Sequence, residues 1–133
     1  MAGQPDAENA DAPTKIELAI NRVRHCGAVA GYQAIARGGE ARLRWMGPSF
    51  GTKLLCFAAY TSGGGPKPLI LDRVVGRALD RFGVYLHYNG WDVTDYEQYL
   101  TIAHQVAERV GVEPHDVEWW LFQIGRLGQT KNL

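Results

Sequence analysis

Two side chains of opposite charge, Lys53 and Asp72, are the main candidates for chemistry in this sequence. Lys53 follows the string Gly47-Pro48-Ser49-Phe50-Gly51-Thr52 and precedes the apolar run LLCFAAY. Since proline and glycine interrupt a helix, the pattern predicts that Thr52 opens a new helix with Lys53 in its first turn. The positive end of the helix dipole there favours the uncharged amine, which is the nucleophilic form. The alternative is an ordinary exposed lysine at a helix end.

Asp72 follows a short apolar segment, Leu69-Ile70-Leu71, and is predicted to cap a helix over about residues 73–82. An N-cap carboxylate is oriented and kept ionised by backbone N–H donors. It could therefore stabilise a positive charge or accept a proton while it caps the helix. Aspartate is also a standard N-cap with no further role, so the position alone does not establish a function.

The glycine-containing string also predicts a hairpin between two helices. Residues 40–46 (EARLRWM) are expected to form a short helix before the turn, and the helix after Thr52 follows it. Unpaired N–H groups at the start of a helix attract phosphate without reading bases. The DNA-backbone contacts expected of this hairpin are those of Pro48, Ser49, Phe50, Gly51 and Thr52. A turn of this composition between two helices is common, so a purely structural hairpin also fits.

Three elements in order resemble the 8-oxoguanine DNA glycosylases of the helix-hairpin-helix superfamily. The string PSFGTK (48–53) is similar to their PGVGTK hairpin, which ends on the lysine that forms a Schiff base. Asp72, nineteen residues after Lys53, stands in the place of the catalytic aspartate, and EWWLF (118–122) resembles a Q-A-V-L-F segment. The resemblance covers about residues 42–126, the catalytic C-terminal half of such an enzyme. It implies an all-α fold that contains a helix-hairpin-helix and a partial helical barrel.

The resemblance implies a base-excision DNA glycosylase that flips an oxidised purine, such as 8-oxoguanine, into a pocket. Lys53 would attack C1′ of the sugar and displace the base, and the resulting imine could support strand cleavage by β-elimination, an AP lyase activity. Asp72 would stabilise the positive charge that develops on the sugar. Phe57 and Phe122 would lie against the extruded base, and Glu118 would contact its Watson–Crick edge.

Several positions depart from the family pattern. Ser49 occupies a glycine-type position of the hairpin, and Val74 replaces a histidine that contacts phosphate, for which Arg73 or Arg77 is the expected substitute. Glu118 replaces a glutamine. Because an ionised carboxylate only accepts hydrogen bonds, we expect a different base preference.

The chain offers only one long helix and a tail before the hairpin, where the family enzymes have further helices. Two alternatives to an enzyme that is active as a single chain therefore stay open. One is a catalytically inactive, truncated helical module that binds DNA or another protein. The other is a homodimer, or a complex with a partner chain, in which the second chain completes the helical barrel.

The remaining patterns predict one helical domain, residues 14–133, after a disordered polar tail, residues 1–13. A capping box from Thr14 to Glu17 would start the first helix, with a break near Gly27 or Gly31 and an end at residues 38–39.

A second capping box over residues 94–97 would start a helix that ends at Gly111, and Pro114 would begin a last helix to about residue 126. No strand of period two is visible. We therefore expect an all-α protein with five or six helices.

Charge is unevenly distributed along a chain whose net charge is zero. Residues 15–81 contain eleven Lys or Arg against four acidic residues, whereas residues 82–133 contain three against seven. A basic segment of this kind is compatible with double-stranded DNA as a partner. Solvated arginines on helix surfaces would produce the same count.

Other classes of site and location are disfavoured by the sequence. Cys26 and Cys56 form no metal-binding pattern and are expected to be buried free thiols, although one disulfide would also fit. The four histidines lack the spacing of a metal site, so neither a metal nor a cofactor is expected. No apolar stretch approaches the ~20 residues of a membrane span, and no secretory signal is visible. We therefore expect a cytoplasmic protein that makes no membrane contact.

Overall fold

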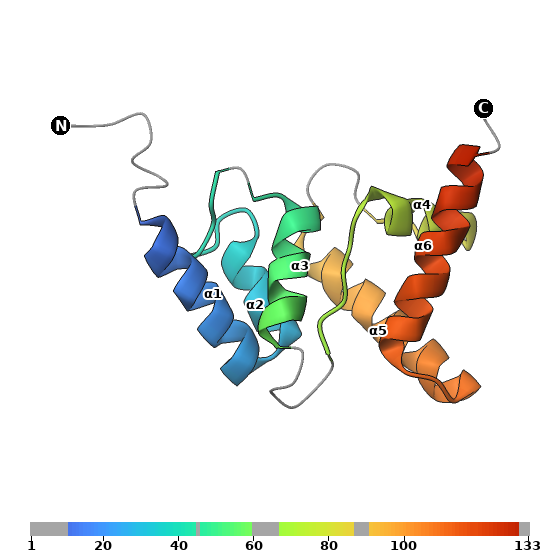
Figure 1. The fold of residues 1–133 in the computed structure, drawn as a ribbon, viewed down its shortest axis with the longest axis horizontal. Helices are drawn as coiled ribbons and strands as arrows, with labels where there is room; N and C mark the ends of the chain where they lie inside the picture. The colour runs from blue at the N-terminus through green and yellow to red at the C-terminus, as the bar shows by residue number, and fades with distance from the viewer. Residues whose placement is uncertain (1–10, 45, 60–66, 87–90, 131–133) are drawn as a thin grey trace.

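The computed structural model describes residues 11–44, 46–59, 67–86 and 91–130, and all regular structure within these ranges is α-helical. The described helices are α1 (Ala12–Cys26), α2 (Ala28–Ile35), α3 (Pro48–Ala58), α4 (Arg73–Arg81), α5 (Val93–Val110) and α6 (Pro114–Thr130). The predicted all-α class is confirmed. Helices α1, α2 and α3 lie side by side at one end, and α4 packs against α6 at the other (Figure 1).

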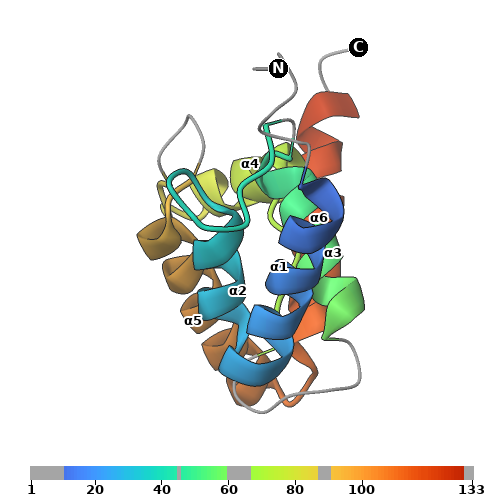
Figure 2. The ribbon, with the colours of Figure 1, turned by 90° about the vertical axis from the view of Figure 1, so that its left-hand side faces the viewer.

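Helix α5 passes behind the others and joins the two ends, since it contacts both α2 and α6 (Figures 1 and 2). In front of it, the extended residues 67–72 run between α3 and α6 (Figure 1). This segment is the connection that brings the chain from the three-helix end to α4. It therefore lies at the centre of the molecule.

The first helical region is interrupted where the sequence predicts a break. Gly27 separates α1 from α2 with a φ of 94°, a left-handed conformation that side chains other than glycine rarely adopt. Gly31, the other candidate for the break, lies inside α2, where a Cβ atom would press against Val23 of α1. The two glycines thus have different functions, one in the turn and one in the close packing of two helices.

Two predicted helix starts are wrong. Helix α1 begins at Ala12 rather than Thr14, because Pro13 fits the first turn of a helix, and its N-cap Asp11 makes no side-chain capping bond. Helix α5 has its capping box at Asp92 and Asp95 rather than at residues 94–97. The predicted end of α5 at Gly111 and start of α6 at Pro114 are confirmed, although α6 extends to Thr130 instead of residue 126.

The expected short helix over residues 40–46 is also absent from the described part of that segment, residues 40–44 and 46. The chain there folds back on α2 instead, with the Ala41 N–H bonded to the Ala34 carbonyl at 2.8 Å, and it buries Leu43 and Met46. Because Pro48 occupies the first turn of α3, the string PSFG is helical rather than a loop. Lys53 consequently lies in the second turn of α3, not the first.

The core contains tyrosines as well as aliphatic side chains. Tyr32, Tyr96 and Tyr99 are each at most 1% exposed, and the rings of Tyr32 and Tyr96 stack with centroids 4.3 Å apart. Both cysteines are free, but the prediction that both are buried is wrong, because Cys26 is exposed and Cys56 is half-buried. The predicted tail lies outside the described residues up to position 10.

Candidate active site

Lys53 and its neighbour Thr52 face opposite environments on α3. Thr52 is completely buried, whereas Lys53 is exposed. The Thr52 hydroxyl donates a hydrogen bond to the Pro48 carbonyl at 2.8 Å within the helix. Its buried position leaves the hydroxyl unable to reach a DNA phosphate in this conformation, and the Thr52 N–H lies beyond the first turn of α3, whose N–H groups alone lack partners within the helix.

Asp72 caps α4 as the sequence predicts. Its Oδ1 accepts the Val75 N–H at 2.9 Å, and the helix extends from Arg73 to Arg81. This hydrogen bond fixes the orientation of the carboxylate at the junction between the extended segment and α4. Arg73 and Arg77 are exposed on the first and second turns that follow.

A buried hydrogen bond links the two candidate catalytic positions. The Leu71 N–H donates to the Thr52 hydroxyl at 3.0 Å, and both residues are fully buried. Thr52 directly precedes Lys53, and Leu71 directly precedes Asp72. The backbone at Lys53 is thereby tied to the backbone at Asp72 across nineteen residues of sequence.

An open cavity of about 340 Å³ lies between α3, the extended segment and the start of α6. Three of the predicted site residues line it, namely Lys53, Phe57 and Glu118. Phe57 is 85% exposed, which is unusual for a phenylalanine and places an apolar ring at the solvent side of the cavity. Three further lining residues have polar side chains that no sequence pattern assigns to a site: Cys56, Lys67 and His115.

The Glu118 carboxylate is bound at the cavity wall. Its Oε1 accepts the Ile70 N–H at 2.8 Å. Burial raises the pKa of this carboxyl, and the nearby Asp72 raises it further, while the bond from Ile70 and the nearby His115 act in the opposite direction. Glu118 therefore lines the cavity while one of its carboxylate oxygens is bound to the protein backbone.

Phe122 and Asp72 are not among the described residues that line this cavity. Phe122 is half-buried and stacks on Trp119, with ring centroids 6.3 Å apart and Arg126 above the ring. Trp119 is 58% exposed, so this pair forms an aromatic surface on α6 rather than part of the core. The structure thus brings Lys53, Phe57 and Glu118 together and leaves Phe122 outside the group.

The start of α3 presents the residues predicted to contact a DNA backbone. Ser49 and Phe50 are exposed, Pro48 is half-buried, and the N-cap Gly47 supplies no side-chain capping bond. Gly51 is buried against α2, where a Cβ atom would collide with Ile35. The glycine in this string therefore serves helix packing, and its N–H is bonded within the helix to the Gly47 carbonyl at 2.8 Å.

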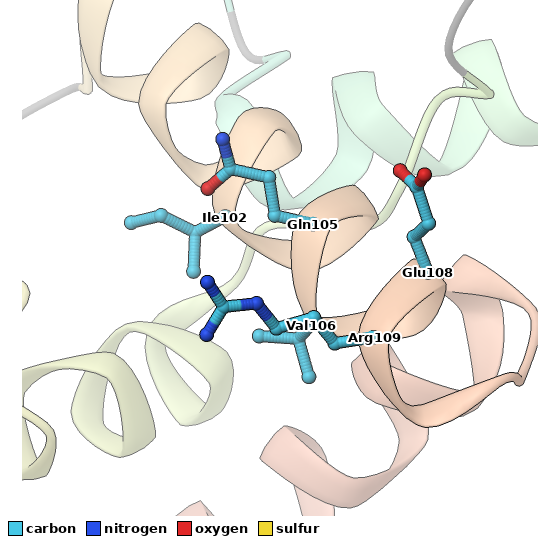
Figure 3. Close-up of a pocket in the computed structure, with 5 residues that line it drawn as sticks. All are labelled: Ile102, Gln105, Val106, Glu108 and Arg109. Carbon is cyan, nitrogen blue, oxygen red and sulfur yellow. The ribbon is translucent and has the colours of Figure 1, made fainter.

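A second, larger hollow of about 640 Å³ lies along α5. Its lining residues all come from that helix, and Figure 3 shows Arg109 extending toward Ile102 while Glu108 points away on another side. None of the predicted site residues lines this hollow. Among the described residues, no group of three or more His, Cys, Asp or Glu side chains is arranged to hold a metal ion. The described helices include none that is long and apolar enough to span a membrane.

Comparison with known protein families places residues 3–122 within one family, whose description reads "Putative 8-oxoguanine DNA glycosylase OGG-like protein". The matched range includes α1 and α2, which the sequence resemblance over residues 42–126 leaves out. It also includes Lys53, Asp72 and all of the cavity-lining residues. Comparisons with the curated proteins and with the solved structures found no match.

Proposed function

The chain belongs to this OGG-like family, and from that premise we propose that it is a base-excision DNA glycosylase that removes an oxidised purine such as 8-oxoguanine. Family membership supports a glycosylase-like function that involves DNA in general. The choice of lesion and the roles of individual residues are our proposal. The observation that carries it is the cavity that Lys53 shares with Phe57 and Glu118.

In the proposed reaction the Lys53 amine, in its neutral form, attacks C1′ of the damaged nucleotide. The C1′–N bond breaks, the base leaves with the electron pair of that bond and takes up a proton, and the nitrogen of the lysine becomes bonded to the sugar. Asp72 stabilises the positive charge that develops on the sugar while the bond breaks. The C1′–O4′ bond of the sugar ring would then open, with a proton passing from the lysine nitrogen to O4′, to give an imine at C1′. The protonated imine would acidify the C–H bond at C2′ and permit β-elimination of the 3′ phosphate, which is AP lyase activity.

The cavity residues suggest how an extruded base would be recognised. The exposed ring of Phe57 on α3 offers an apolar face for stacking, and Glu118 on α6 offers a carboxylate oxygen. An ionised carboxylate accepts hydrogen bonds, so it favours a base edge with N–H donors, such as the N1–H and N2–H₂ groups of a guanine derivative. Adenine presents an acceptor at N1 and would be disfavoured.

Contacts with the duplex are proposed at the start of α3 and along α4. Ser49 and Phe50 present backbone N–H groups at an exposed helix start, and Arg73 and Arg77 are exposed near Asp72. These contacts would bind phosphates without reading sequence. We therefore expect duplex affinity to fall with rising salt concentration.

The proposal is tested by borohydride trapping on a duplex that contains 8-oxoguanine, together with an assay of base release. Wild-type protein should form a covalent product, and Lys53→Gln should abolish it. Lys15→Gln is the matched control, since that lysine lies on α1 and donates to the Arg42 carbonyl at 3.2 Å, away from the cavity. Absence of both trapping and base release in the wild type would refute the glycosylase proposal.

A non-catalytic DNA-binding module is the second candidate. The observation that favours it is that Asp72 does not line the cavity with Lys53. Salt-dependent binding of the duplex without release of any base would support this candidate. Absence of duplex binding would remove both.

A further inference from the structure

The extended residues Leu69, Ile70 and Leu71 have a backbone bound by side chains instead of a neighbouring strand. Tyr96 binds both polar groups of Leu69: its hydroxyl accepts the N–H at 3.1 Å and donates to the carbonyl at 2.8 Å. The Tyr99 hydroxyl donates to the Ile70 carbonyl at 2.9 Å. Both tyrosines belong to α5, so one helix holds two consecutive residues of the segment.

Two other helices complete the set. Glu118 of α6 accepts the Ile70 N–H at 2.8 Å, and Thr52 of α3 accepts the Leu71 N–H at 3.0 Å. The Thr52 hydroxyl also lies 3.5 Å from the Leu71 carbonyl, at the limit of a hydrogen bond. The single proton of that hydroxyl is donated to the Pro48 carbonyl at 2.8 Å, so every backbone N–H and carbonyl from Leu69 to Leu71 except the Leu71 carbonyl has a side-chain partner.

This arrangement determines the position of the segment closely. Leu69 and Leu71 are at most 2% exposed, so water cannot replace a lost partner without rearrangement. A buried backbone group left without a partner is costly, and a slip of the segment by one residue would leave several groups unpaired at once. The segment thus has one favourable register against α3, α5 and α6.

Asp72 is the next residue after this segment. Its carboxylate is fixed on one side by the Val75 N–H of α4 and on the other by the held backbone of Leu71. We propose that Tyr96 and Tyr99 are positioning residues that hold the Asp72 carboxylate in place through the extended segment, without themselves touching the substrate. The effect on catalysis rests on the proposed function, whereas the effect on the position of Asp72 does not.

A tyrosine that is buried only for packing needs one hydrogen-bond partner for its hydroxyl, and packing alone would explain why the rings of Tyr96 and Tyr99 are buried. Tyr96 instead uses its donor and acceptor on the same residue, which packing does not require. Burial raises the pKa of both tyrosines well above the usual value, so the hydroxyls remain protonated and able to donate at any pH used in an assay.

The test compares Tyr99→Phe with a matched control, Tyr32→Phe. The Tyr32 hydroxyl is also part-buried and also donates to a backbone carbonyl, that of Trp91, which lies outside the extended segment. Each substitution removes one such hydrogen bond and keeps the ring. We expect the two variants to lose similar thermal stability.

Amide hydrogen exchange measures the position of Asp72 directly, because the Val75 N–H is its hydrogen-bond partner. In Tyr99→Phe, the protection of Val75 relative to Val23 of α1 should fall about tenfold. In Tyr32→Phe this ratio should stay within about twofold of wild type. Equal ratios in the two variants would overturn the inference, whether or not the protein has glycosylase activity.

Activity provides the second readout. In Tyr99→Phe the single-turnover rate of base release should fall about tenfold, while the dissociation constant for an uncleavable duplex changes less than about twofold. Tyr32→Phe should match wild type in both. An inactive wild type would refute the proposed function and leave the exchange result to decide the positioning of Asp72. If the wild type is active and the two variants have equal rates, the proposed role of the tyrosines in catalysis is refuted, and the exchange result still decides whether they position Asp72.

Discussion

The hydrogen bond between Thr52 and Leu71 predicts that Thr52→Val is less stable than Thr52→Ser, whereas apolar burial alone would predict the opposite order. Thr52→Val keeps the volume and shape of the side chain but removes the hydroxyl. The Leu71 N–H then has no acceptor in a fully buried position. The Pro48 carbonyl loses less, because it still accepts from the helix backbone.

The expected magnitude follows from that single orphaned donor. A buried group without a partner costs roughly 1–3 kcal/mol, so we expect Thr52→Val to lower the free energy of unfolding by about 2 kcal/mol. For a domain of this length the melting temperature should fall by roughly 6–8 °C. Thr52→Ser keeps the hydroxyl and removes one buried methyl group, which should cost only about 1 kcal/mol.

Urea unfolding followed by tryptophan fluorescence would measure both variants, and a constant m-value would show that the comparison is one of stability. The predicted order is wild type, then Thr52→Ser, then Thr52→Val. If apolar burial dominated, valine would be at least as stable as serine. That result would refute the view that the Thr52 hydroxyl holds the extended segment.

Two further predictions concern α6. The pKa of Glu118 is raised in the folded protein, so folding disfavours the ionised form of this carboxyl. The protonated carboxyl therefore contributes its full stability below the unfolded pKa of about 4.3, and this contribution is lost as pH rises through the folded pKa. Glu118→Gln should therefore gain stability relative to wild type as pH rises across this range, measured by urea unfolding at several pH values; a constant difference would contradict the assigned burial. A Cβ atom at Gly125 would collide with the Val74 backbone carbonyl of α4, so Gly125→Ala should destabilise by about 2–3 kcal/mol. Gly47→Ala, where no atom lies within 4 Å of the added Cβ, should change the free energy of unfolding by less than about 1 kcal/mol, and equal losses at both glycines in thermal melts would rule out the collision.

Features that depend on nearby residues were predictable from the sequence. The break at Gly27, the cap at Asp72 and the end of α5 at Gly111 each follow from the conformational or hydrogen-bonding preference of one residue. The start of α6 at Pro114 is of the same kind. Local chemistry decides these positions, and tertiary contacts agree with it.

The segment before α3 shows the opposite case. Residues 40–46 have a composition that suits a helix, but the chain there pairs with the end of α2 and buries Leu43 and Met46. Tertiary packing overrides a weak helical preference in a short segment, and the sequence alone carries no signal for it. Lys53 lies in the second turn of α3 and not the first because α3 begins at Pro48, four residues before the predicted start at Thr52.

The site was predictable only in part, for a similar reason. Lys53, Phe57 and Glu118 share a cavity, and the first and last of these lie 65 residues apart in sequence, so only the family resemblance linked them. The role of the tyrosines in holding residues 69–71 gave no local signal. Tyr96 and Tyr99 have the helical spacing that is typical of core residues, and both rings are buried in the core. Their hydroxyls acquire hydrogen-bond partners only when the extended segment packs on α5.

The two candidate catalytic groups therefore depend on the fold in different ways. Lys53 is exposed on a flexible four-carbon side chain and can reach its target from a range of backbone positions. Asp72 has a short side chain whose carboxylate is fixed by the Val75 N–H, so the position of the carboxylate is set by the backbone at residue 72. Catalytic groups must be held within about 0.5 Å of their working geometry, and this demand falls on Asp72 and hence on the extended segment. Substitutions that loosen the segment should lower the rate of the chemical step, whereas substitutions of Ser49 and Phe50 at the exposed start of α3 should act mainly on duplex binding.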